Sequence, residues 1–201
     1  YNNAKYKHLN KRKNSTADGY SLNPKKMIPY KKTPSDSRTI LTDLVLPGET
    51  NHLNAMFGGE LLARMDRAAS IASQRHSGRA TVTVSVNHVA FTHSIRVGSI
   101  VTVEAAISRA FSSSMEVYID VWMENTYGER TKATEAIYSF VAVDENGRPV
   151  KVPELEPETE LEKERFKGAL QRRQLSLVIA GKLSPHDATE LKALFTELEN
   201  S

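Results

Sequence analysis

NHLNAMFGGELLARMDRAASIASQRH, residues 51–76, is the stretch that decides the fold, because it reads as a turn followed by a long helix. At ~100° per residue, one face of that helix collects apolar side chains, namely Leu61, Leu62, Met65, Ala68, Ala69 and Ala72. The opposite face collects Glu60, Arg64, Arg67 and Gln74. Two features exceed what a packing helix needs: the pair Gly58-Gly59 at its start, and Asp66 at the edge of the apolar face.

Composition sets the general class of the protein. The chain has 201 residues and a hydrophobic content of 39%, enough for one domain with a core. No apolar run approaches the ~20 residues that a membrane span needs, and the first residues are rich in lysine, so we expect a soluble, cytoplasmic protein. The absence of cysteine excludes disulfides, thiolate metal ligands and cysteine nucleophiles, which fits a reducing compartment.

Charge is distributed unevenly along the chain. Residues 1–38 contain ten Lys or Arg and two Asp, a net charge of +8, whereas the remaining 17 basic and 22 acidic residues give −5. Three prolines within this basic segment oppose a helix. We therefore predict an extended basic arm over residues 1–38, a main domain over 39–153 and a helical extension over 154–201. The arm is either a solvated tail or a contact for an anionic surface or a partner subunit.

Five strand candidates accompany the helix. RTILTDLVL (38–46) precedes it, and TVTVSVNHVAF (81–91), SIVTVEAAISRAF (99–111), SMEVYIDVWME (114–124) and ATEAIYSFVAVD (133–144) follow it. Turn signals at 96–98, 111–113 and 125–128 separate the last four. Short connections favour antiparallel neighbours, so the order predicts an α+β fold with the helix across one face of an antiparallel sheet.

The C-terminal residues are charged and predict helices. Residues 158–181 form one helical segment, and Ser184 followed by Pro185 resembles the cap and first position of a second helix. An apolar stripe in that second helix indicates a docking or subunit-contact face; it consists of Leu191, Leu194, Phe195 and Leu198.

Several catalytic motifs are absent, which narrows the possible chemistry. The chain has no G-x-S-x-G nucleophile elbow, no H-E-x-x-H zinc pair, no phosphate-binding G-x-x-x-x-G-K-[ST] loop and no G-x-G-x-x-G. Its six histidines do not pair at ligand spacing on any predicted helix. We therefore expect no metal site.

The glycine pair and the acid remain as candidates. A helix that begins with Gly58-Gly59 presents free N–H groups at the positive end of its dipole, which suits an oxygen that develops negative charge. Asp66 could act as a base or a nucleophile. Eight residues separate Gly58 from Asp66, or about 12 Å along a helix, so one helix cannot aim both at one carbonyl. Two antiparallel copies could, and a catalytic motif therefore predicts at least a dimer.

The motif N-H-L-x-x-M-F-G-G-E-L-L-x-x-M-D-x-A-A, followed by S-V-N-H-V-x-F, resembles the acyl-CoA thioesterases of the hotdog fold. Later stretches agree, and the resemblance covers about Thr39 to Phe195. It implies a five-stranded antiparallel sheet wrapped around one long helix, and dimers that often assemble into trimers of dimers. It also implies hydrolysis of acyl-CoA to free acid and CoA, with no cofactor beyond the CoA of substrate and product.

The resemblance assigns roles at the helix. Asp66 would activate water or attack the thioester, the Gly58 amide would polarise the carbonyl beside Gly59, and Asn51 would orient water or substrate. Much of the family has glycine where this chain has Asn54, and some relatives have a polar residue at the next position, here Ala55. Asn51 and Asn54 therefore compete for the supporting role, and we prefer Asn51.

The CoA end is assigned in the same way. The pantetheine arm would pass Asn87, His88 and Val89. The nucleotide phosphates would lie near the surface, where Ser112, Ser113, Ser114, Arg109 and Lys132 offer hydroxyl and cationic partners.

Two other functions compete with hydrolysis. A non-catalytic acyl-CoA-binding regulator would use the same groove while the basic arm touches nucleic acid, but no helix-turn-helix pattern supports a DNA reader. A hotdog dehydratase would use a histidine base, and the helix has none before His76, at its far end.

Overall fold

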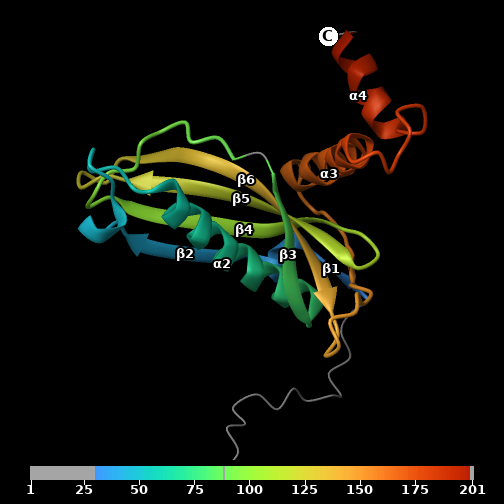
Figure 1. Cartoon of the computed structure of the whole chain (residues 1–201), viewed down its shortest axis with the longest axis horizontal. Coiled ribbons are helices and arrows are strands. Elements are labelled where there is room, and N and C mark those ends of the chain that lie inside the picture. Colours follow the sequence, from blue (N-terminus) through green and yellow to red (C-terminus); the bar gives the residue numbers. More distant parts are fainter. Residues whose placement is uncertain (1–29, 88, 200–201) are drawn as a thin grey trace, which may run out of the picture.

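The computed structural model of the protein describes residues 30–87 and 89–199. Five strands form one antiparallel sheet in the order β2-β4-β5-β6-β3. Their bounds are β2 (Thr39–Leu44), β3 (Ala80–Asn87), β4 (Ile100–Ala110), β5 (Ser114–Glu124) and β6 (Arg130–Val143). The sheet curls around one long helix, α2 (Gly58–Ser77), as Figure 1 shows. The predicted five-stranded antiparallel sheet wrapped around a helix is confirmed.

Helix α2 ends where its sequence provides a stop, and it packs closely because its inner face is small. Gly78 adopts a left-handed conformation (φ 63°) and caps the helix, with its N–H bonded to the Gln74 carbonyl. The buried face combines Leu61 and Met65 with three alanines, and the alanines let the strands approach the helix closely. As a result α2 packs against all five strands of the sheet.

The core lies between α2 and the inner face of the three central strands. Alternate residues of each strand point inward, which matches the period of two of a half-buried strand. The fully or almost fully buried set comprises Val101, Val103, Ala105, Ile107, Met115, Val117, Ile119, Val121, Ala136, Tyr138, Phe140 and Ala142. Burial of each large apolar side chain contributes roughly 1.5–3 kcal/mol.

Arg64 departs from the helical pattern, which placed it on the solvent face. It is buried, and its guanidinium pairs with Glu49 at 2.7 Å and Asp43 at 3.3 Å. Glu49 belongs to a short 3-10 helix (Pro47–Glu49) in the loop after β2, and this loop covers the Arg64 side of α2. The prediction that Arg64 is exposed was wrong, because the loop after β2, and not the helical period, determines its burial.

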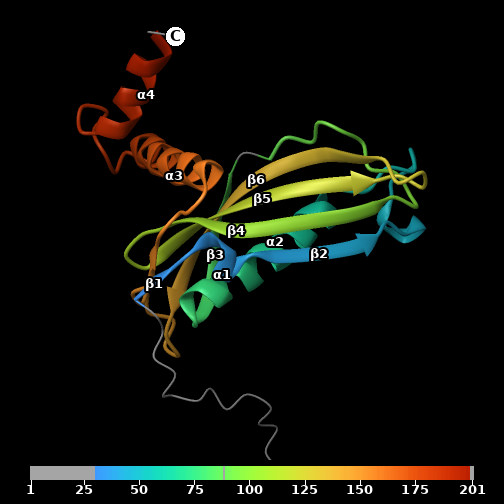
Figure 2. The ribbon, with the colours of Figure 1, turned by 180° about the vertical axis from the view of Figure 1, so that it is seen from behind.

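The segment before β2 is part of the folded body. β1 (Lys31–Lys32) pairs in parallel with β7 (Glu154–Leu155), and α1 (Pro34–Ser37) leads into β2. Figure 2 shows both elements beside the start of β2. The Ser37 hydroxyl accepts a hydrogen bond from the Ile107 N–H at 3.0 Å. Residues 30–37 of the predicted arm therefore form structure, and residues 1–29 lie outside the described residues.

Helix α3 (Glu160–Ile179) lies on the outer face of the sheet, opposite α2. Its arginines pair with carboxylates that point outward from β5: Arg165 with Asp120 at 2.7 Å, and Arg172 with Glu116 at 2.7 Å. The sheet also reaches the helix, because the Arg109 guanidinium donates to the Phe166 carbonyl at 2.9 Å. Three charged contacts thus fix α3 to the sheet.

Helix α4 (Thr189–Glu199) begins later than predicted. Ser184 closes a single turn instead, since its side chain accepts from the His186 N–H and its carbonyl from the Asp187 N–H. The buried Ala188 then precedes the helix. In the stripe that was predicted to dock, Leu191 and Leu194 are half-buried and Phe195 is exposed.

The edge strand β3 exposes three valines. Val82, Val84 and Val86 are 47%, 55% and 48% exposed. Among the described residues, no helix is both long and apolar enough to cross a membrane.

Candidate active site

Asp66 lies in the third turn of α2, half-buried, and is held by the neighbouring strand β3. The Thr83 hydroxyl donates to Asp66 Oδ1 at 2.8 Å, so Oδ2 is left for other partners. Tyr138, from β6, is buried nearby, and its pKa is raised to about 12 by burial and by the charge of Asp66. Its hydroxyl stays protonated and donates to the Leu62 carbonyl at 3.4 Å. The carboxylate is therefore oriented from one side only.

Sequence reasoning missed Thr83, although a signal was present. Thr81 and Thr83 alternate on the face of β3 that packs on α2, and both bond to polar helix residues, Ser73 and Asp66. Two polar residues spaced by two on an otherwise valine-rich strand indicate partners across the interface. The helix residue that each threonine contacts depends on how β3 is positioned along α2, and the sequence pattern does not determine this position.

The start of α2 is open, as the glycine pair predicted. The N-cap residue, Phe57, makes no side-chain capping bond, and its carbonyl accepts from Glu60 and Leu61. Within the described residues, the N–H groups of Gly58 and Gly59 make no hydrogen bond. These two donors are free to bind an oxygen, and the helix dipole favours negative charge there.

A small apolar cavity adjoins Gly58. Its volume is about 300 Å³, and its walls include Met56, Leu61, Phe91 and Ile95. The end of the Phe91 ring would lie only 3.3 Å from a Cβ placed on Gly58, so a side chain at this position would press on the ring. Gly58 therefore adjoins a space whose lining is mainly apolar, with His93, Ser94 and Thr134 as its polar members.

The two candidate asparagines do different things. Asn51 Oδ1 accepts from the N–H groups of Leu53 and Ala55, at 2.9 and 3.2 Å, and so holds the loop before α2. Its side-chain N–H₂ makes no hydrogen bond among the described residues and could donate to a ligand. Asn54 has a left-handed backbone (φ 56°), a conformation that favours glycine and that asparagine tolerates. Asn54 thus supplies the backbone turn for which much of the resembled family uses glycine.

Gly58 and Asp66 do not meet within one chain. Both residues belong to α2. They are eight residues apart, which corresponds to about 12 Å along the helix axis. The separation on which the prediction of a shared site rests is therefore present in α2.

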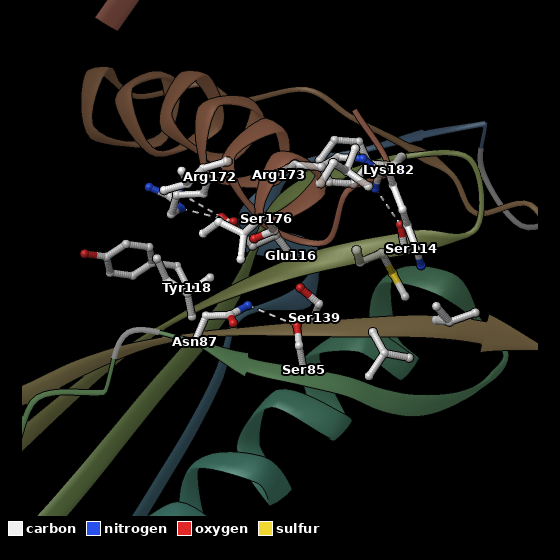
Figure 3. Close-up of a pocket in the computed structure, with 18 of the residues that line it drawn as sticks. Ser85, Asn87, Ser114, Glu116, Tyr118, Ser139, Arg172, Arg173, Ser176 and Lys182 are labelled. Carbon is white, nitrogen blue, oxygen red and sulfur yellow. Dashed lines mark hydrogen bonds and ion pairs between the residues drawn. The ribbon is translucent and has the colours of Figure 1, made fainter. Parts of the chain in front are cut away.

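Of the described residues assigned to the CoA end, two line a common groove and the others do not. The outer groove, as we call it, has a volume of about 890 Å³ and runs between α3 and the outward faces of β3, β5 and β6. Asn87 lies toward one end and Ser114 toward the other (Figure 3). Ser112 and Ser113 sit in the preceding turn, where their carbonyls accept from Val152 and Ala142. His88 lies outside the described residues.

Both cations assigned to the CoA end are held elsewhere. Arg109 packs its guanidinium on the Phe166 ring, 4.0 Å from the centroid, and burial lowers its pKa. Lys132 pairs with Asp120 at 2.8 Å and Glu135 at 2.6 Å. Val89 packs against the core. The cations that do line the outer groove, Arg172, Arg173 and Lys182, come from α3 and the turn after it, and sequence reasoning did not single them out.

Comparisons with known proteins show the family to which the chain belongs. The profile of the thioesterase superfamily matches residues 53–128, from the loop before α2 to the end of β5 and the turn after it. An uncharacterized acyl-CoA thioester hydrolase of Bacillus subtilis, YkhA, is 41% identical over 138 residues, which cover 68% of this chain and 80% of that protein. The chain belongs to the acyl-CoA thioesterases of the thioesterase superfamily.

Solved structures of this family have the same fold. A hexameric acyl-CoA thioesterase superposes with a TM-score of 0.73 at 40% identity, covering 76% of this chain and 98% of that one. The acyl-CoA hydrolase of Staphylococcus aureus, in complex with butyryl-CoA and CoA, superposes with a TM-score of 0.70 at 35% identity, covering 76% and 94%. Variants of that hydrolase in which an aspartate, a threonine or an asparagine is replaced by alanine have also been solved. The predicted hotdog thioesterase fold and enzyme class are confirmed.

Proposed function

We propose that this thioesterase hydrolyses the thioester of acyl-CoA to a carboxylic acid and CoA at a site that two copies of the chain build together. One observation carries the proposal. Helix α2 holds an oriented carboxylate in its third turn and two free amides at its start, too far apart to act on one carbonyl. A second, antiparallel copy of the helix brings Asp66 close to the partner's Gly58.

The edge strand β3 offers the surface for that pairing. Its exposed valines and its free edge are suited to a second β3, which would extend the sheet across a two-fold axis. The relatives support an assembly of this kind, because solved thioesterases of this fold are hexameric. We infer a homodimer at least, and a trimer of dimers as the full assembly.

The alanine variants of the S. aureus hydrolase support the choice of residues. In that chain the replaced asparagine, aspartate and threonine follow one another at intervals of 15 and 17 positions. Asn51, Asp66 and Thr83 follow one another at the same two intervals. Three residue types in the same order and at the same spacing favour a shared role.

The proposed reaction needs only protein groups and water. Asp66 takes a proton from a water molecule whose oxygen forms a bond to the thioester carbonyl carbon, or its own oxygen attacks that carbon and gives an anhydride that water then hydrolyses. The partner's Gly58 binds the developing oxyanion through its N–H. In the first route the C–S bond then breaks, and Asp66 passes the proton to the leaving sulfur. In the second route the C–S bond breaks as the anhydride forms, and the water that hydrolyses the anhydride supplies the proton that the thiolate takes up. We propose that Asn51 holds the water or the carbonyl and that Thr83 fixes the carboxylate.

The acyl chain has a place beside the oxyanion donor. The cavity at Gly58 is lined by Met56, Leu61, Phe91 and Ile95, and burial of an apolar chain there is favourable. We propose that this cavity receives the acyl group and that Phe91 limits its length.

A hydrolysis screen tests the proposed function. Purified protein is offered acyl-CoA esters from acetyl to palmitoyl, and free CoA is measured with a thiol-reactive reporter. We expect release of CoA that a chelator does not change, and a fall of roughly 10²-fold or more in Asp66→Asn, which is nearly isosteric. Release from none of the esters would disprove hydrolysis, and loss with chelator that zinc restores would disprove the metal-free mechanism.

The alternative of an acyl-CoA-binding regulator has no support among the described residues. It depended on the basic arm, of which residues 1–29 lie outside them. The same screen decides this alternative too, because a regulator binds the ester without releasing CoA.

A further inference from the structure

Arg64 is a buried arginine that binds the chain just before α2. It lies in the second turn of α2, and its side chain is 6% exposed. Its Nη2 donates to both carboxylate oxygens of Glu49, at 2.7 and 2.9 Å, and to the Leu44 carbonyl at 3.3 Å. The same nitrogen lies 3.3 Å from Asp43, and Nη1 makes no hydrogen bond among the described residues. Within the described chain, the guanidinium therefore binds only the end of β2 and the loop after it.

Glu49 connects this arginine to the backbone of the loop. Its Oε2 accepts from the Leu46 N–H at 2.8 Å, which closes the 3-10 helix. The hydrogen bonds from Leu46 and then from Arg64 hold the pKa of Glu49 below its ordinary value, so the carboxylate is charged at neutral pH. The Glu49 carbonyl accepts from the Phe57 N–H at 2.9 Å. Glu49 thus binds Arg64 through its side chain and the N-cap of α2 through its backbone.

Two groups of the proposed reaction lie at the ends of the loop that Glu49 closes. We call residues 49–57 the Asn51 loop. Asn51 lies two residues after Glu49, and Gly58 directly follows Phe57. The loop turns back on itself, because the Asn51 N–H donates to the Ala55 carbonyl at 2.8 Å. A shift of Glu49 would therefore move both Asn51 and the start of α2.

The Asn51 loop is held from two sides. On one side the Met56 N–H donates to the Ile95 carbonyl at 2.7 Å, and the Val97 N–H to the Asn54 carbonyl at 3.1 Å. These backbone bonds fix the loop to the segment before β4. On the other side Arg64 fixes it to α2, which carries the catalytic groups. The loop lies at the end of the molecule away from α3, as Figure 1 shows, so the C-terminal helices do not hold it.

We propose that Arg64 is a positioning residue for the hydrolysis, which acts through Glu49 to hold Asn51 and the Gly58 amide in a fixed relation. This role rests on the proposed function and adds a residue to it. Arg64 and Asp66 are two residues apart, about 200° around the helix, so they point to opposite sides of α2. Arg64 therefore touches no reacting atom. A displacement of about 1 Å of groups that orient the substrate can lower turnover roughly 10²-fold.

Substitution of Arg64 separates positioning from binding. Arg64→Met keeps an unbranched buried side chain and removes the hydrogen bonds, and we expect kcat to fall about 10-fold or more with little change in KM. Arg64→Lys should recover most of this loss, because a single nitrogen makes all the bonds to the loop. A rise in KM with kcat unchanged, or a lysine variant as impaired as the methionine variant, would overturn the proposal.

A double-variant cycle tests whether the two side chains act as one unit. Glu49→Gln keeps the size of the side chain and removes its charge, so it weakens the same pair. The variant with both Arg64→Met and Glu49→Gln should be no slower than the slower single variant. Losses of kcat that multiply would show that Arg64 does not act through Glu49.

Arg67→Met is the matched control. Arg67 is exposed on the same helix, and its charge also acts on Glu49, but it makes no hydrogen bond to it among the described residues. We expect wild-type kcat and KM for this variant. A loss as large as that of Arg64→Met would mean that charge near Glu49 matters and the hydrogen-bonded pair does not.

Hydrogen exchange tests the positioning without turnover. In Arg64→Met the Asn51 and Phe57 amides should exchange about 10-fold faster than in wild type, whereas β4 and β5 should be unchanged. If Arg64→Met does not fold, Glu49→Gln is measured in the same way, because Glu49 is partly exposed and its replacement leaves the core intact. Unchanged exchange of both amides would overturn the proposal.

The two readouts distinguish failure of this inference from failure of the proposed function. If the wild-type protein hydrolyses no ester and the exchange still rises, the proposed function fails while Arg64 is shown to hold the loop. If the wild-type protein hydrolyses acyl-CoA and Arg64→Met has faster exchange with an unchanged kcat, the proposed function stands and the positioning role of Arg64 is wrong.

Discussion

Mixed dimers of two inactive variants test the shared site most directly. Asp66→Asn removes the carboxylate charge while keeping its size, and should lower turnover roughly 10²-fold. Gly58→Val is chosen to block the oxyanion donor. A Cβ at Gly58 would lie 3.3 Å from the Phe91 ring, so the two further methyl groups of valine add bulk where the space is already tight. Loss of one oxyanion donor lowers kcat by about 10²–10³-fold.

The magnitude of the recovery follows from the geometry. If Asp66 acts with the partner's Gly58, a mixed dimer has one site with both lesions and one with neither. Random re-association of equal amounts makes half of the dimers mixed, so turnover should return to about a quarter of the wild-type value per subunit in the mixture and to about half in isolated mixed dimers. Each variant carries a different affinity tag, and sequential purification isolates the mixed dimers for the CoA-release assay.

One result would refute the reasoning. Verified mixed dimers that remain as inactive as their parents would show that Asp66 and Gly58 do not serve one carbonyl across the two-fold axis. Tm values of the two parents, measured first, exclude loss of folding as the cause of their inactivity.

Three further outcomes are expected. Thr83→Val loses the hydroxyl bond to Asp66 and should lower kcat about 10-fold with little change in Tm, whereas Thr83→Ser keeps the hydroxyl and should leave kcat unchanged. Equal losses of Tm in both variants without an effect on kcat would contradict this. Phe91→Ala should raise kcat/KM for long acyl chains relative to short ones by about 10-fold or more, and an unchanged chain-length profile would place the acyl group elsewhere. His76 is fully buried, and burial holds its pKa below the ordinary 6.5, so the unfolded chain takes up the proton first as pH falls. The contribution of His76 to the free energy of unfolding should therefore be complete above about pH 6.5 and should fall by up to ~1.4 kcal/mol per pH unit below it. Urea unfolding at several pH values should show a smaller pH dependence for His76→Gln than for the wild type.

Local periodicity was enough to predict the elements of the main domain. The alternation in residues 99–111 and 114–124 predicts β4 and β5 to within one residue, and the apolar face of 58–75 predicts α2. Alternation and helical period act through nearest neighbours in the chain, so a sequence displays them directly. The second C-terminal helix was placed too early because Ser184 can cap a helix or close a turn, and the bonds to His186 and Asp187 make it a turn.

By itself, the sequence determined the parts of the catalytic proposal that lie on one element. The glycine start, the acid two turns later and the distance between them are properties of a single helix, and from them the sequence predicts that a catalytic motif here needs two chains. Tertiary structure alone decided which residues face one another across elements. It placed Thr83 on Asp66, buried Arg64 under the 3-10 helix, and put Arg173 rather than Arg109 in the outer groove. The first depends on the bulge in β3, because a shift of one residue along a strand turns every following side chain to the opposite face. The second depends on the loop after β2, and the third on the docking of α3.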